Sequence, residues 1–296
     1  MARARRSKNS NKHYPVQRKM RLRETASPQT NDTQMQILVD KQLSAINHRL
    51  YRQSRIYSCK VEIDASLPTG AFVDVYALSD TWMNMKAYQY AKKQYDKNSN
   101  EEMSAIAQSN VGRWNDFRVG LAATTARADM NAIVRSAAAE TALTSGKYLL
   151  SEVTDAAGVT HEFAWLESDS NTFNIIDEYD RTGDTQQTPT FEQSTVAYAD
   201  LDDQIDSDQV EHLTGQGDEP PYDDRNLENA CLSRVARLYV DNEGQGKLST
   251  AYFNAPCGII YCVAGGGMTS ITLSDSLCVE VKAGDYKGVH APNMLE

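Results

Sequence analysis

The feature that most constrains the fold of this chain is a series of short segments in which apolar and polar residues alternate. The clearest runs from Tyr57 to Ile63, where every second residue is apolar. Side chains of a β-strand point alternately to the two faces of a sheet, so this period predicts a strand with one buried face. Ala71 to Leu78 is a second run, rich in β-branched and aromatic residues, and the turn-forming sequence Leu67-Pro68-Thr69-Gly70 separates the two.

Further strand-like segments follow in the second half of the chain. They are Lys147–Val153, Val159–Glu167, Phe173–Asp180, Ser194–Ala199, Leu232–Val240, Leu248–Phe253, Cys257–Val263 and Ser270–Lys282. This gives about nine or ten strands that do not alternate regularly with helices, which argues against parallel βαβ units. The pattern predicts a mainly β fold, a single β-sandwich of the jelly-roll type over residues 33–296.

Helical patterns are fewer, and we expect them as insertions between strands. A capping box at Thr33 predicts a short helix in the residues that follow it. Residues near 81–120 are predicted to form two helices, the second beginning at a capping box at Ser99. The alanine-rich stretch 126–144 predicts a third helix, because alanine has the highest intrinsic helix propensity.

Charge is distributed very unevenly along the chain. Nine basic residues and no acidic residue lie between Met1 and Arg23: Arg3, Arg5, Arg6, Lys8, Lys12, Arg18, Lys19, Arg21 and Arg23. The rest of the chain holds the other 21 of the 30 basic residues and all 40 acidic ones. The chain after Arg23 therefore carries a formal charge of −19. Residues 1–32 have too few apolar side chains to offset the entropy of ordering, which predicts a disordered, basic N-terminal arm.

A cationic arm on an acidic body indicates a polyanionic partner for the arm. With no local anion to neutralise them, the nine cations are predicted to contact the phosphates of a single-stranded nucleic acid without reading its sequence. Two other interpretations stay open. The arm could be a solubility tail, or the cluster Ala2–Lys8 could be a signal for the nuclear import machinery.

The region from Glu152 to Glu228 holds 21 acidic residues and only two basic ones. Within it, four carboxylates fall at places one, three, nine and twelve of a calcium-loop pattern: Asp200, Asp202, Asp208 and Glu211. Place six is Ile205 instead of the glycine that the sharp turn of an EF-hand demands. A solvated acidic loop is therefore the default interpretation, and a looser calcium site is the alternative.

Motifs that would indicate an enzyme, a structural metal or a membrane anchor are missing from the sequence. The five cysteines contain no CxxC pair, and we expect them to be free, small, buried hydrophobic residues. The five histidines form no HxxxH or HxH pair, Gly265-Gly266-Gly267 lacks the lysine of a phosphate loop, and no GxSxG occurs. No apolar run is long enough for a signal peptide or a membrane span. We therefore expect a protein that is not an enzyme and has no membrane partner.

Three stretches carry a resemblance to a known family: LPTGAFVDVYALSDTW (Leu67 to Trp82), RWNDFRV (Arg113 to Val119) and AGDYKGVHAP (Ala283 to Pro292). With the basic arm and the order of the strands, they resemble capsid proteins of small circular Rep-encoding single-stranded DNA (CRESS-DNA) viruses. The resemblance spans most of the chain from about Asn47 onward. It implies a jelly-roll coat protein that self-assembles into an icosahedral virion, with its arm on the packaged DNA, and that occurs in the host nucleus or cytoplasm during assembly.

Two alternatives to this resemblance stay open at the level of sequence. Small positive-strand RNA viruses of the tombusvirus-like or nodavirus-like kind also combine a basic arm with a jelly roll. A cellular jelly-roll binding module with a nucleic-acid-binding tail is an alternative of another class.

Overall fold

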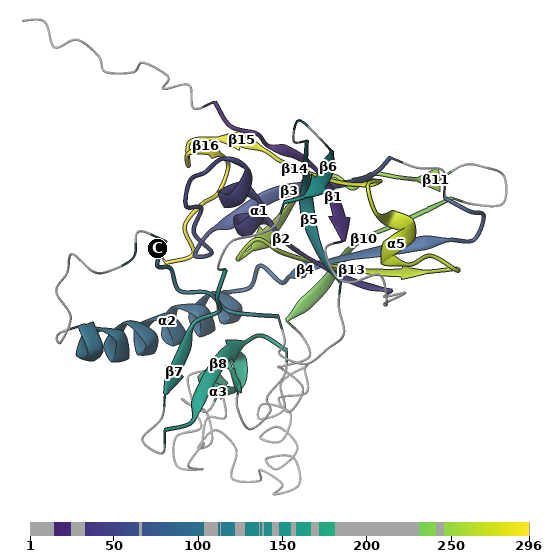
Figure 1. The fold of residues 1–296 in the computed structure, drawn as a ribbon. Coiled ribbons are helices and arrows are strands. Elements are labelled where there is room, and N and C mark those ends of the chain that lie inside the picture. The colour runs from purple at the N-terminus through teal and green to yellow at the C-terminus, as the bar shows by residue number, and fades with distance from the viewer. Residues whose placement is uncertain are drawn as a thin grey trace, which may run out of the picture.

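The computed structural model describes residues 15–24, 33–64, 67–103, 112, 114–121, 128–135, 137, 139–143, 148–154, 158–166, 172–180, 231–240 and 246–295. The protein is mainly β, with a large curled sheet and a few helices, as the alternating segments predicted (Figure 1). No helix among the described residues combines the length and the apolar character needed to cross a membrane.

The strands are short and most of them lie in the two ends of the chain. They are β1 (Lys19–Glu24), β2 (Gln34–Leu38), β3 (Ile56–Ile63), β4 (Phe72–Leu78), β5 (Ala128–Arg135), β6 (Glu140–Ala142), β7 (Glu152–Thr154), β8 (Thr160–Ala164), β9 (Thr172–Asn174), β10 (Leu232–Val240), β11 (Gly246–Lys247), β12 (Phe253–Pro256), β13 (Ile259–Gly265), β14 (Leu277–Val281), β15 (Ala283–Gly284) and β16 (Gly288–Val289). The helices are α1 (Val39–Ile46), α2 (Trp82–Met103), α3 (Ile175–Asp180) and α5 (Ser270–Leu273).

Eight of these strands form the two layers of a jelly roll. One layer has the order β1-β14-β3-β12 and the other β2-β13-β4-β10, and all neighbours within a layer are antiparallel. Along the chain these eight strands pass from one layer to the other at every step except that from β4 to β10. Such alternation between two antiparallel sheets is the double Greek-key connectivity of a jelly roll, which confirms the predicted fold class.

Strand β5 joins the two layers along one side, because it pairs antiparallel with β1 and parallel with β2. It lies in residues 126–144, for which we predicted a helix, so that prediction is wrong where the structure describes these residues. Ala128, Met130 and Ala132 are buried at every second position, which is the period of a strand. Pairing with strands on both sides thus overrides the helix propensity of alanine.

The basic N-terminal segment contributes the first strand of the jelly roll. The prediction of a disordered arm over residues 1–32 is therefore wrong for Lys19–Glu24, and the folded domain begins before residue 33. Met20 and Leu22 are buried, whereas the cations that alternate with them along β1 are partly or fully exposed. These cations are Lys19, Arg21 and Arg23. Two apolar side chains among so many charges are too few to reveal the period, and partners from β14 and β5 complete the strand.

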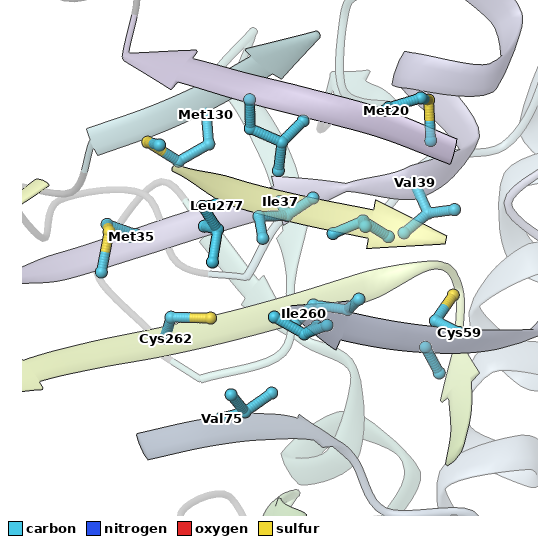
Figure 2. Close-up of a cluster of buried hydrophobic side chains, with 14 of the residues drawn as sticks. Met20, Met35, Ile37, Val39, Cys59, Val75, Met130, Ile260, Cys262 and Leu277 are labelled. Carbon is cyan, nitrogen blue, oxygen red and sulfur yellow. The ribbon is translucent and has the colours of Figure 1, made fainter. Parts of the chain in front are cut away.

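The space between the two layers is filled with apolar side chains, which we call the sandwich core (Figure 2). Its members come from strands far apart in the sequence, among them Met20, Met35, Ile37, Cys59, Val75, Met130, Ile260, Cys262 and Leu277. All five cysteines are free and buried, as predicted. Burial of this apolar surface is the main favourable term that holds the layers together.

Between β4 and β10 the chain makes a long excursion, residues 79–231, which we call the insertion. Besides β5 and β6, which pair with each other beside the layers, it holds α2, β7, β8, β9 and α3, which lie together at one end of the jelly roll (Figure 1). Helix α2 is continuous through Ser99, so the prediction of two helices, the second starting there, is wrong. The capping box predicted at Thr33 does not start a helix either, since β2 follows it and α1 begins at Val39.

Aromatic side chains form a second apolar cluster, which we call the insertion core. Trp165 and Tyr88 are fully buried and stack with their ring planes 6° apart, and Phe117 packs on Tyr88. Leu78 of β4 and Ile259 of β13 belong to the same cluster. The insertion is therefore packed onto one layer of the jelly roll.

Candidate nucleic-acid interface

Of the nine arm cations, the structure describes four, which are Arg18, Lys19, Arg21 and Arg23. The other five, Arg3, Arg5, Arg6, Lys8 and Lys12, lie outside the described residues. The four that are described lie on or beside β1, where the strand period sends the cations of β1 to the outer face of the sheet.

Three of these cations are paired with carboxylates of the folded domain. The Lys19 ammonium lies 2.7 Å from Glu62, and Arg21 pairs with Asp64. The prediction that no local anion neutralises the cations of the arm is therefore wrong for these two.

The third pair, between Arg23 and Asp275, is bidentate. Its two hydrogen bonds measure 2.5 and 2.6 Å. The hydrogen bond from Arg23 lowers the pKa of Asp275, so this carboxylate stays ionised well into the acidic range. The cations of β1 thus have partners already, unlike cations on a free chain.

A second group of cations lies on the folded domain, and we call it the loop cluster. It consists of Arg49, Arg52 and Arg55 from the loop between α1 and β3, and Lys287 from the turn between β15 and β16. The guanidinium of Arg55 lies 4.2 Å from the ring centre of Tyr286, and the Lys287 ammonium lies 5.2 Å from it. One aromatic ring therefore holds cations from both segments together.

Hydrogen bonds fix the two segments of the loop cluster to each other. The backbone N–H of Arg52 donates to the Tyr286 hydroxyl at 3.2 Å, and the Tyr51 hydroxyl donates to the Lys287 carbonyl at 3.0 Å. Arg55 also donates to the carbonyl of Ala291 at 3.3 Å. The cations are thus held in place by the fold.

The cations of the loop cluster are close enough to influence one another. Burial lowers the pKa of Lys287, and the positive charges of Arg49, Arg52 and Arg55 lower it further. Asp116 opposes this effect and lies 3.7 Å from Arg52, but burial raises the pKa of its own carboxyl group. The cluster therefore keeps a positive potential on a body that is acidic overall.

The point where the N-terminal segment joins the folded domain, at Gln17, lies beside the loop cluster. The side-chain oxygen of Asn47 accepts a hydrogen bond from the Gln17 N–H at 2.8 Å, and its amide nitrogen donates to the Gln17 carbonyl at 3.1 Å. Arg49 follows Asn47 by two residues. The described chain thus begins next to the loop that carries three of the four clustered cations.

Sequence reasoning missed the loop cluster, although a signal for it exists. Three arginines recur at every third position in Arg49–Arg55, and Lys287 lies in one of the stretches that carry the family resemblance. No local pattern in the first stretch brings it next to a turn more than 230 residues later. Only the fold joins the two.

The calcium candidates Asp200, Asp202, Asp208 and Glu211 lie outside the described residues. Within the part of the chain that the structure describes, no three His, Cys, Asp or Glu side chains gather in a way that could hold a metal ion. His161 lies on β8 with its ring stacked on Phe173, as expected for a strand residue. The triple glycine ends β13 and makes the turn that leads into α5, with positive φ at Gly266 and Gly267.

A scan against models of protein families, a search of curated proteins and a search of solved structures each found no match.

Proposed function

We propose that this chain is the structural subunit of a shell that self-assembles and packages a single-stranded nucleic acid, as in the capsids of small circular Rep-encoding DNA viruses. The observation that carries the proposal is the junction of two features. The first strand of the jelly roll, β1, is the end of a segment that carries nine cations. That segment joins the folded domain beside the loop cluster. In this role the chain is a scaffold and a binder, not a catalyst.

The division of charge supports this function. Bodies that carry a formal charge of −19 outside the basic segment repel one another unless salt screens them. A nucleic acid that binds many basic segments at once opposes this repulsion, because it holds the segments, and with them the bodies, on one polymer. Assembly would then be coupled to packaging.

The ion pairs of β1 revise how many phosphates the N-terminal segment can contact. Nine free cations would give a log-log slope of binding against salt of roughly −6, at about −0.7 for each contact. Because Lys19, Arg21 and Arg23 already have carboxylate partners, six cations of the segment remain, and they give a slope of roughly −4. Contacts from elsewhere on the body would add to this value.

The test measures binding of the full chain to single-stranded DNA by fluorescence anisotropy at several salt concentrations. Replacing Arg3, Arg5, Arg6, Lys8 and Lys12 with glutamine should reduce the slope by roughly 3 and leave thermal unfolding unchanged. Oligonucleotides of equal length and different sequence should bind alike, because phosphate contacts carry no base information. Unchanged binding by this variant would overturn the proposed role of the arm.

A further inference from the structure

We propose that the loop cluster is a second phosphate-binding site, on the rigid body of the domain, for the same nucleic acid strand that the arm binds. The inference rests on the proposed function, because it names a further contact surface for the same ligand. The inference goes beyond the proposed function because it assigns phosphate binding to residues that the sequence did not single out. These residues are Arg49, Arg52, Arg55 and Lys287.

The cations at the centre of this site are held by neutral groups. Arg55 lies on the Tyr286 ring and donates to a backbone carbonyl, and its Nε is buried without a hydrogen-bond partner within the described structure. Lys287 donates to the carbonyl of Leu50 and lies near the rings of Tyr51 and Tyr286. Neither contact cancels a charge, so both side chains can still attract an anion.

A phosphate group would relieve a cost that the free protein carries. Burial lowers the pKa of Lys287, and the positive charges of the three arginines lower it further, so its protonated form is disfavoured in this place. An anion among these groups reverses the sign of this interaction. The buried carboxyl group of Asp116 lies 3.7 Å from Arg52 and also acts on Lys287, whose pKa it raises. A phosphodiester carries one negative charge, shared by two non-bridging oxygens, and it can approach the solvent-exposed side of the cluster.

The site and the arm are placed to hold one continuous strand. Two hydrogen bonds join Gln17 to Asn47, which lies two residues before Arg49. The five cations that precede Gln17 in the sequence are therefore linked to the body at the edge of the cluster. In Figure 1 the first described residues run past the β15–β16 hairpin. A strand held near this junction can also reach the cluster, and fixed cations add affinity at a smaller entropic cost than mobile ones.

The ligand class is the sugar–phosphate backbone, without base recognition. The ring of Tyr286 is already covered by Arg55 and approached by Lys287, so it offers no free face for stacking a base. We therefore expect inorganic phosphate to compete only weakly, because one phosphate replaces one contact of many. A polyphosphate of similar length should compete well.

The experiment compares two charge-matched double variants of the full chain for binding to an oligothymidylate of about 30 nucleotides. Arg49→Gln with Arg52→Gln removes two exposed cations of the cluster. Lys93→Gln with Lys247→Gln removes two exposed cations from α2 and β11, away from the hairpin (Figure 1). At 0.15 M salt the first variant should bind roughly tenfold more weakly, with a slope reduced by about 1.4, and the second should bind nearly as the parent does.

A third variant, Arg49→Lys with Arg52→Lys, keeps the charge and should restore most of the binding. Should the glutamine variant fail to fold, formaldehyde crosslinking of the parent chain to single-stranded DNA of mixed sequence gives an independent answer, since it joins lysine amino groups to bases and should label the peptide that contains Lys287. Equal binding by both glutamine variants, or crosslinks confined to residues before Pro15, would overturn the inference. In that case the five-residue arm variant would still report on the proposed function separately.

Discussion

The jelly roll and the insertion are stabilised in different ways. The two layers of the jelly roll meet through an apolar core to which nearly every strand contributes at alternate positions. The insertion shares an aromatic core with one layer, but polar side chains that are fully buried also attach it to the jelly roll. The comparison teaches that apolar residues at alternate strand positions are enough to hold the two layers together. Specific hydrogen bonds, in contrast, determine where the insertion lies.

Three polar side chains of α1 and the following loop make these attachments. Gln53 accepts from the Val119 N–H at 2.6 Å and donates to its carbonyl at 2.9 Å, as a neighbouring strand would. Gln42 accepts from the Ala132 N–H at 2.8 Å and so holds β5. Asp40 accepts from the Tyr148 hydroxyl at 2.6 Å. Each leaves a buried group without a partner if it is lost.

The largest effect should come from the centre of the insertion core. Trp165→Ala removes a fully buried indole and should lower the free energy of unfolding by about 3–5 kcal/mol. Because Leu78 and Ile259 of the jelly roll belong to the same core, we expect one cooperative transition at a lower temperature. Trp114→Ala, at a position that is 51% exposed, is the matched control and should change little. An early, separate transition by calorimetry would show that the two regions unfold independently.

The second effect tests whether β1 belongs to the jelly roll. Leu22 is fully buried between the layers, so Leu22→Ala should lower the free energy of unfolding in urea by about 2–5 kcal/mol. The control is Leu149→Ala, because that side chain is 63% exposed. If Leu22→Ala cost no more than this control, the segment would be part of a free arm, as the sequence first suggested.

The third and smallest effect concerns pH at the junction. Burial raises the pKa of Asp40 to about 7, although the Tyr148 hydroxyl, the Lys41 backbone N–H and the charge of Arg118 oppose the shift; Asp116 adds to it. The folded state therefore retains a proton that the unfolded state has lost above about pH 4. The contribution of Asp40 to stability is greatest below that pH and is lost as the pH rises to about 7, by roughly 2–3 kcal/mol between pH 5 and pH 8.

Asp40→Asn separates this carboxyl group from the other titrating groups. The variant should show a flatter dependence of urea midpoint on pH, with a residual slope from Asp116, whose pKa burial also raises. Tyr148→Phe removes the donor that stabilises the ionised carboxylate, so it should shift the decrease to higher pH. A decrease of the same size and midpoint in Asp40→Asn would assign the effect to another group.

The sequence predicted the jelly roll better than the insertion, for a physical reason. Strands β3, β4 and β10 were predicted within one or two residues, because one face of each packs on a single core and the period is visible. In β5 two of the four buried residues are alanines, which also favour helix, and in β1 charges outnumber apolar residues. A polar residue such as Gln53 is predicted to be exposed from its residue type. The spacing of apolar residues therefore could not reveal that it is buried where the insertion meets the jelly roll.

The candidate interface was predicted in part. The excess of positive charge before Arg23 is a property of composition, and the sequence shows it directly. Which cations have partners depends on residues such as Glu62 and Asp275, which come near because β1 pairs with β14 and β14 pairs with β3. The loop cluster likewise needs the hairpin around Lys287 to reach the α1–β3 loop.

The central claim, that jelly-roll subunits close into a shell around a nucleic acid, is tested most directly by electron microscopy of the full chain. Purified protein is mixed with circular single-stranded DNA at low salt, treated with nuclease and imaged in negative stain. The account predicts closed particles of one diameter that protect the DNA, because the cationic segments converge on the polymer and screen the acidic bodies. Isolated subunits and digested DNA at every salt and calcium concentration would contradict it.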